Sequence, residues 1–294
     1  MKKTLIILML LLMFSFGCTT KKEDGVQTTG GKAFAFTGSN GILVEFDKDA
    51  PPSTNFLNEP IEVIIKLTNR GAIALSSGEV KARLKGVAAT EIFRPSTKES
   101  GNKEELLAAE LSPTVSEVQL GPITYSPEKM FSAEYRPEIE AEVCFPYSTK
   151  VNANNFWISD KQDDLSKGSI SGSDNSDAPV HVSGLEEFKA TDKVRFQFTV
   201  ENVGKGKVVD ACFPEEKSEE KVRVNILEPR GVNCETLAGS SGEIKLIEGK
   251  KLVRCTTDAP AGESYQTPLV MELEYNYDIG LSKVITVKNL ESVN

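Results

Sequence analysis

The stretch that decides the fold is residues 61–71, IEVIIKLTNRG, in which apolar side chains alternate along the chain and an Asn-x-Gly turn follows. The same phrase returns at residues 194–204, VRFQFTVENVG. Superimposing the two runs brings apolar residues together at 61 and 194, 63 and 196, 65 and 198, and 67 and 200. Such alternation is typical of a β-strand with one buried face. The repeated phrase therefore predicts two copies of one β-unit.

Two further matches follow in the same order. Residues 116–120, SEVQL, match 242–246, GEIKL, and residues 142–147, EVCFPY, match 272–277, ELEYNY. Three matches in one order indicate an internal duplication. Other short alternating runs lie between turn residues, so we expect an all-β chain of two tandem β-sandwiches. The one helical pattern is KEELLAAEL at 103–111, and it predicts a short helix at one end of a sandwich.

The N-terminus has the pattern of an export signal. Residues 1–18 read MKKTLIILMLLLMFSFGC, with two lysines, an apolar run and a small residue before Cys18. A cysteine in this place resembles the lipobox of prokaryotic lipoproteins, which implies cleavage after residue 17 and a lipid on Cys18. A cleaved signal with a spare cysteine and an uncleaved anchor are the alternatives. The expected location is outside the cytoplasm, on the cell membrane.

Composition changes along the chain suggest the domain layout. Residues 18–32 are almost devoid of large apolar side chains and predict a flexible tether. We expect one domain at 33–158, a Ser-, Gly- and Asp-rich linker at 159–178, and a second domain at 179–294. The chain has 43 acidic and 34 basic residues. Such an acidic chain is repelled by nucleic acid, so we expect no nucleic-acid partner.

Apart from Cys18, the chain has four cysteines, which we expect to pair outside the cytoplasm. Three pairings are possible. The glycine-rich stretch between Cys234 and Cys255 favours a hairpin-like return and a disulfide between these two, which leaves Cys144 with Cys212. The alternative for Cys144 and Cys212 is a pair of small buried thiols.

Patterns that carry catalytic chemistry are weak in this sequence. His181 is the one histidine, and its place between Val180 and Val182 predicts a solvent-facing strand residue rather than a ligand or proton shuttle. The run 239–242, GSSG, lacks the spacing of a nucleophile elbow. We therefore expect no enzyme, no cofactor, no metal site and no small-molecule substrate.

Two side-chain groups leave alternatives open. The acidic residues of the linker offer oxygen atoms to calcium, although a solvated loop is the favoured interpretation; they are Asp160, Asp163, Asp164, Asp174, Asn175 and Asp177. Aromatic residues cluster near the end of each repeat, and we expect them in the core rather than on an exposed recognition face; they are Phe145, Tyr147, Phe156, Trp157, Tyr275 and Tyr277.

An alternating strand closing in Asn-x-Gly, together with the Cys-Phe-Pro-Tyr run at 144–147, resembles the immunoglobulin-like CARDB and S-layer-type modules of prokaryotic surface proteins. The resemblance covers about residues 35–290. It implies that the two tandem β-sandwiches are immunoglobulin-like and that their role is structural or adhesive, without catalysis. The partner would be an envelope protein or a glycan, with the membrane contacted through lipid on Cys18. The alternative is an envelope assembly or chaperone-like subunit that uses an exposed edge strand.

Overall fold

The computed structural model describes residues 34–90, 92–109, 112–127, 132–214, 218–259 and 261–289. Residues 31–294 fall into one compact unit. The predicted signal peptide, Cys18 and the whole of the predicted tether lie outside the described residues. The expected all-β sandwich class is confirmed: sheets dominate, and the described helices are short ones, α2 (Gln162–Leu165), η2 (Gly86–Ala89) and η3 (Gly172–Asp174).

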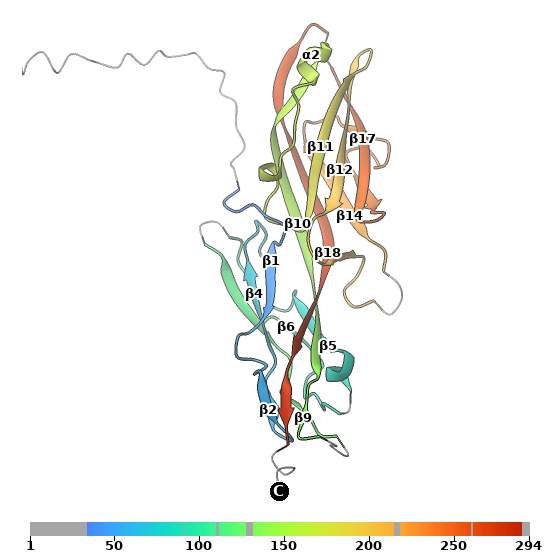
Figure 1. The fold of residues 1–294 in the computed structure, drawn as a ribbon. Helices are drawn as coiled ribbons and strands as arrows, with labels where there is room; N and C mark the ends of the chain where they lie inside the picture. Colours follow the sequence, from blue (N-terminus) through green and yellow to red (C-terminus); the bar gives the residue numbers. More distant parts are fainter. Residues whose placement is uncertain are drawn as a thin grey trace, which may run out of the picture. The chain divides into compact units, whose positions relative to one another are not determined.

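The fold is organised around two unusually long strands. β10 (Glu138–Ser159) and β18 (Ser264–Val284) pair antiparallel along nearly their whole length, from Glu138 opposite Val284 to Ser159 opposite Ser264. A β-bulge after Ala153 interrupts the register once. We call this pair the central ribbon. In Figure 1 it runs through the middle of the ribbon drawing.

Further strands extend the central ribbon on both sides. The order is β16-β14-β18-β10-β5-β6, and β13 also pairs with β18. Their bounds are β16 (Ser241–Lys245), β14 (Lys221–Glu228), β13 (Lys207–Val209), β5 (Lys81–Lys85) and β6 (Glu99–Gly101). We call this seven-stranded assembly the central sheet.

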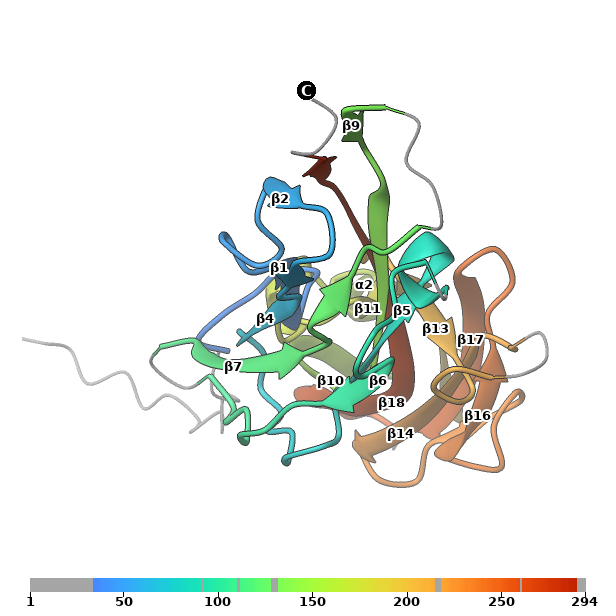
Figure 2. The ribbon, with the colours of Figure 1, turned by 90° about the horizontal axis from the view of Figure 1, so that it is seen from below.

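Two smaller sheets pack on the apolar face of the central sheet. The first region has β1 (Ile42–Phe46), β4 (Ile64–Asn69) and β7 (Thr114–Gln119), in the order β1-β4-β7. The second region has β11 (Val180–Lys189), β12 (Lys193–Asn202), β17 (Lys250–Asp258) and β15 (Asn233–Cys234), in the order β11-β12-β17-β15. Figure 2 shows β1, β4 and β7 grouped on one side and β14, β16 and β17 on the other.

Three-stranded and two-stranded sheets complete the first region. The three-stranded sheet has the order β2-β19-β9, with β2 (Thr54–Phe56), β19 (Thr286–Lys288) and β9 (Glu134–Tyr135). The two-stranded sheet joins β3 (Pro60–Ile61) to β8 (Ile123–Thr124). The strand β19 thus carries the C-terminal end of the chain back to residues near the start of the first region.

The alternation seen in the sequence decides which face each strand buries. In β12, Val194, Phe196, Phe198 and Val200 are buried and the residues between them are more exposed. Phe156 of β10 meets Phe196 edge-on, with ring centroids 4.9 Å apart, so the second small sheet packs directly on the ribbon. Burial of this apolar face is the main stabilising contribution of both regions.

The predicted helix at 103–111 is wrong for the residues described there. Residues 103–109 contain no helix. Leu106 is fully buried and forms a β-bridge with Leu75, with hydrogen bonds of 2.8 and 2.9 Å in the two directions. Tertiary pairing therefore overrides the local helix propensity of this segment.

The predicted linker is tied to the folded strands. Asn155 and Ser169 form a β-bridge, as do Val151 and Asn175. The side chain of Asp177 is buried and accepts hydrogen bonds from the N–H groups of Asn40 and Gly41 at 3.0 and 2.9 Å. The division into two domains stays a prediction, but the central ribbon is common to both regions.

Candidate functional site

The second face of the central sheet is polar and lies open. Along the ribbon, the side chains that alternate with the buried ones are mostly charged or small, and on β18 they include Glu272, Glu274 and Asn276. The small sheets of both regions pack on the opposite face, where Leu273, Tyr275 and their alternate neighbours are buried. An open sheet face with alternating polar residues is a normal consequence of antiparallel pairing.

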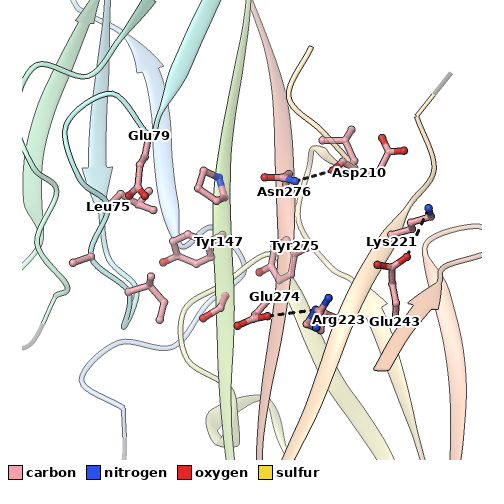
Figure 3. A pocket seen from close by; sticks show the side chains of 15 residues that line it. Leu75, Glu79, Tyr147, Asp210, Lys221, Arg223, Glu243, Glu274, Tyr275 and Asn276 are labelled. Carbon is pink, nitrogen blue, oxygen red and sulfur yellow. Dashed lines mark hydrogen bonds and ion pairs between the residues drawn. The ribbon is translucent and has the colours of Figure 1, made fainter. Parts of the chain in front are cut away.

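A groove of about 620 Å³ lies on this face. Figure 3 shows Leu75 and Glu79 on one side of the ribbon and Lys221, Arg223 and Glu243 on the other. The floor is formed by β10 and β18, at residues 146–148 and 274–276. We call this hollow the groove.

The charged groups on the far wall of the groove form loose ion pairs. Arg223 Nε lies 3.8 Å from a carboxylate oxygen of Glu274, and Lys221 Nζ lies 3.7 Å from Glu243. Lys221 also contacts Glu219 at 3.3 Å, and this hydrogen-bonded carboxylate raises the pKa of the lysine. Exposed pairs of this kind contribute little to stability, so their charges are available to a ligand.

The floor of the groove contains a gap in the strand pairing of β10. The pairing with β5 ends at Cys144, and the next partner is Ser176, which exchanges hydrogen bonds with the backbone of Lys150. Pro146 and Ser148 lie between these points. Ser148 is buried, and its hydroxyl donates to Glu272 at 3.0 Å. Proline at the gap removes a backbone donor, which lowers the tendency of this edge to pair.

Two disulfides are present, in the pairing that the sequence favours. Cys144 is bonded to Cys212, and Cys234 to Cys255. The first bond ties β10 to the chain between β13 and β14, next to Asp210 on the groove wall. Asn276 donates to the backbone oxygen of Asp210 at 3.0 Å, so this wall is attached to the ribbon at two points.

A pair of carboxyl groups lies beside the disulfide on the open face. Burial and a hydrogen bond with Glu142 raise the pKa of Asp278 to about 7. Burial acts to raise the pKa of Glu142 as well, but hydrogen bonds from Asp278, Arg83 and Lys85 hold it below the usual value. Arg83 lies 2.6 Å from Glu142, and Lys85 lies 3.1 Å from it. Neighbouring carboxyls commonly share one proton in this way.

The aromatic residues singled out in the sequence belong to the core, as expected. Phe145, Tyr147, Phe156, Tyr275 and Tyr277 are all buried. Trp157 is half-buried, and the ammonium of Lys167 lies 5.1 Å from its ring centroid. Their rings therefore do not form an exposed recognition face.

His181 has the alternation predicted for it but a different environment. Val180 and Val182 on either side are buried, while the imidazole is half-buried rather than solvent-facing. Its Nε2 lies 2.9 Å from the backbone oxygen of Gly38. Burial lowers the pKa of His181. The segment around Gly38 covers this residue, which strand periodicity alone does not reveal.

Several acidic or amide residues of the predicted linker accept hydrogen bonds within the fold. Asp174 accepts from Ser171 in a capping box, and the Asn175 amide bonds the backbone of Val182 at 2.8 and 3.0 Å. Hydrogen bonds from Ser264 and Lys167 lower the pKa of Asp164 to about 2. Within the described ranges, no three metal-ligating side chains come together.

The groove residues Arg223, Glu274 and Asn276 were not among the residues predicted from the sequence. The sequence feature that could have indicated them is their position among the polar residues that alternate with buried ones on β14 and β18. Alternation predicts that such residues face away from the core, but it does not predict which strands lie side by side. In the part of the chain that the structure describes, no helix is long and apolar enough to cross a membrane.

A comparison with models of known protein families found none that matches this chain, and a comparison with curated protein sequences found no match.

Proposed function

We propose that this chain is a lipid-anchored binding protein of the cell surface, without catalysis, whose groove holds a segment of an envelope protein or glycan. Export and the lipid on Cys18 are part of the proposal and come from the pattern of residues 1–18. A lipid of two or more acyl chains would supply lasting membrane attachment. The role as a structural or adhesive module is the one that the CARDB-like and S-layer-like phrases imply.

The observation that carries the proposal is the groove on the open face of a sheet whose two central strands serve both regions. Its volume of about 620 Å³ is within the usual size range of ligand sites. Arg223 and Glu274 offer opposite charges in loose pairing, and Asn276 offers an amide oxygen. The disulfide between Cys144 and Cys212 holds the wall, so little ordering is needed on binding.

The test is chemical crosslinking on intact cells followed by mass spectrometry. We expect the intact chain to crosslink to one or a few envelope components, and the Cys18→Ser variant to lose them because it leaves the membrane. The Arg223→Ala, Glu274→Ala double variant removes the two charges next to the floor of the groove and should lower the crosslinked yield about tenfold. Arg195→Ala is the matched control, because Arg195 is exposed on β12, away from the groove.

Unchanged crosslinking in the double variant would contradict the groove as the binding site. Unchanged membrane attachment of the Cys18→Ser variant would contradict the anchor. The two parts of the proposal therefore fail separately.

A second candidate function is the assembly subunit that binds a partner strand at a sheet edge. The observation that favours it is the exposed stretch of β18 from Gly280 to Val284. Val284 keeps 59% of its surface exposed, and Gly280 and Ser282 are also exposed. The same stretch carries the inference below.

A further inference from the structure

We propose that the free edge of β18 between Gly280 and Val284 binds one extended peptide segment of a partner protein, in which basic and apolar side chains alternate. The segment would join the central sheet as an added strand. The inference rests on the second candidate function above and is independent of the groove.

Hydrogen bonds in the central sheet show which backbone groups face this edge. The N–H of Ile226 donates to Ser240, on the β16 side, so Arg223 and Asn225 direct their backbone groups toward β18. Arg223 and Asn225 pair with Glu274 and Glu272 of β18. The backbone N–H and C=O groups of the even-numbered residues of β18 therefore point toward β14 and away from β10. The register with β10 continues without a shift as far as Val284. The backbone groups of Gly280, Ser282 and Val284 therefore point outward from the ribbon.

The open stretch is bounded at both ends by strands of the same chain. β13 lies beside β18 from Asn276 to Asp278. Beyond the open stretch, Thr286 donates to Ser53, and β2 then lies beside β19. Between these two strands, in the part of the chain described, no strand pairs with this edge of β18.

The strands β13 and β2, which flank the open stretch, limit the length and type of strand that can pair with it. A second copy of this chain would bring its own β13 and β2 to the places that β13 and β2 already occupy. A single extended segment of about five residues fits between them, since a strand advances roughly 3.3 Å per residue. The geometry thus favours an isolated peptide strand over an edge-to-edge dimer.

Another long edge of the molecule is closed by side chains. On β11, the Asn175 amide bonds both backbone groups of Val182. The Gln162 amide accepts from the Lys189 N–H at 2.9 Å and donates to the Glu187 oxygen at 3.3 Å. Such capping protects an edge against strand addition. At the open edge, the residues whose backbone groups point outward, Gly280, Ser282 and Val284, have small or apolar side chains, and among the described residues no side chain caps them in this way.

The polar side of the open edge is acidic. A cavity of about 350 Å³ lies there, lined in part by Glu138, Glu140 and Glu142 of β10, by Lys85 of β5, and by Gly280 and Ser282. Glu142 is paired with Arg83 and Lys85, so the negative charge offered to a basic side chain comes from Glu138 and Glu140. Gly280 has no side chain, and a Cβ added there would meet nothing within 4 Å. Lysine or arginine side chains from an added strand therefore pass over β18 toward β10, about two strand spacings or roughly 10 Å away.

The other side of the edge is apolar. Ile279 and Leu281 of β18 and Phe46 of β1 are partly buried against the core. Side chains of an added strand alternate between the two sides, so those that do not reach the glutamates meet this apolar surface. Lys283 also faces this side, but its ammonium is engaged by the backbone oxygen of Lys48 at 3.4 Å. The preferred segment is therefore basic on one face and apolar on the other.

The test measures binding of fluorescent seven-residue peptides to the chain by polarisation. One peptide alternates lysine with valine, and the second alternates glutamate with valine. We expect the lysine peptide to bind the chain at least about tenfold more tightly than the glutamate peptide. A double variant, Glu138→Lys with Glu140→Lys, should instead bind the glutamate peptide more tightly than the lysine peptide.

Ser282→Pro is the decisive variant, with Ser282→Ala as its matched control. Proline at 282 removes an N–H that the fold does not use and blocks strand addition. We expect it to weaken lysine-peptide binding by about tenfold or more, while Ser282→Ala stays within about twofold of the parent chain. If Ser282→Pro does not fold, the peptide preference of the Glu138→Lys, Glu140→Lys variant is the test of the inference.

Equal binding of the two peptides by the parent chain, or undiminished binding by a folded Ser282→Pro variant, would overturn the inference. Loss of lysine-peptide binding in Arg223→Ala, Glu274→Ala with retention in Ser282→Pro would place the peptide in the groove. That result would contradict the edge and leave the groove proposal standing.

Discussion

The two Asn-x-Gly turns have the same sequence pattern, and in each of them the asparagine accepts a hydrogen bond from a tyrosine hydroxyl. In the first region, Asn69 accepts a hydrogen bond from the Gly71 N–H at 3.0 Å and one from the Tyr147 hydroxyl at 3.4 Å. In the second region, Asn202 accepts from the Gly204 N–H and from the Tyr277 hydroxyl, both at 3.1 Å. The aligned tyrosines therefore close equivalent turns.

The glycine of each turn is explained by the tyrosine. A Cβ at Gly71 would lie 1.7 Å from the Tyr147 hydroxyl oxygen, and a Cβ at Gly204 would lie 2.3 Å from that of Tyr277. Neither glycine has a positive φ. Space for the hydroxyl, rather than backbone strain, is what these positions require.

The turns differ in how deeply the asparagine is buried and in what else it binds. Asn69 is completely buried, and its amide also donates to Ile73 and Leu107 at 2.6 and 3.0 Å. Asn202 is half-buried and donates to Gly206 at 2.9 Å. The same Asn-x-Gly motif therefore anchors a long loop in the buried interior of the first region and supports only a local turn in the second.

The largest expected effect separates the two asparagines. Asn69→Ala should lower the free energy of unfolding by about 3 kcal/mol or more, because it leaves several buried backbone groups without partners. Asn202→Ala should cost about 1–2 kcal/mol, since water reaches that turn. Urea denaturation of both variants checks the difference. Equal losses would break the contrast between anchor and local support.

The stability of the second region, unlike that of the first, should fall at alkaline pH because of Glu187. Glu187 of β11 is buried, and burial raises its pKa to about 8, although it accepts a hydrogen bond from the Trp157 N–H at 2.9 Å. The folded state therefore binds the Glu187 proton more tightly than the unfolded state does. The contribution of the protonated side chain to the free energy of unfolding is complete below about pH 4.5 and is lost as the pH rises through about 8.

We expect Glu187→Gln to be about 2 kcal/mol more stable than the parent chain at pH 9 and close to it at pH 5. Hydrogen exchange should locate the alkaline loosening of the parent chain in β11 rather than in β4. An unchanged pH profile in Glu187→Gln would show that another group controls it.

The smallest effects should rank the two tyrosines in the opposite order to the asparagines. The Tyr277 hydroxyl also accepts from the Gly206 N–H at 2.8 Å, whereas the second bond of Tyr147, to the Asp177 backbone oxygen, is 3.5 Å long. Tyr277→Phe should therefore cost about 1–1.5 kcal/mol and Tyr147→Phe about 0.5 kcal/mol. Thermal unfolding in matched buffers checks this ranking. A larger loss for Tyr147→Phe would contradict it.

Much of the fold follows from the alternation of apolar residues, because burial of one strand face is a local property. The match of EVCFPY with ELEYNY even places Tyr147 over Tyr277, which occupy equivalent sites. The great length of the two ribbon strands, Glu138–Ser159 and Ser264–Val284, was not predicted from the sequence. The bulge after Ala153 shifts the alternation there, so a strict period of two ends too early.

The groove and the free edge were not predictable in the same way. Both depend on which strands become neighbours, and that depends on pairing between residues more than a hundred positions apart. The helix predicted at 103–111 failed for a related reason, since the partner of Leu106 is Leu75 and local propensity contains no information about it.

The order of synthesis gives the central ribbon a kinetic consequence. A ribosome releases β10 more than a hundred residues before its partner β18, so the first region stays incomplete until nearly the whole polypeptide has emerged. Topologies with such distant contacts fold slowly, and unpaired strands attract aggregation in the interval. We therefore expect nascent chains of this protein to be prone to aggregation until β18 has emerged, and a chain truncated before residue 264 to lack the strand that completes the central ribbon of both regions.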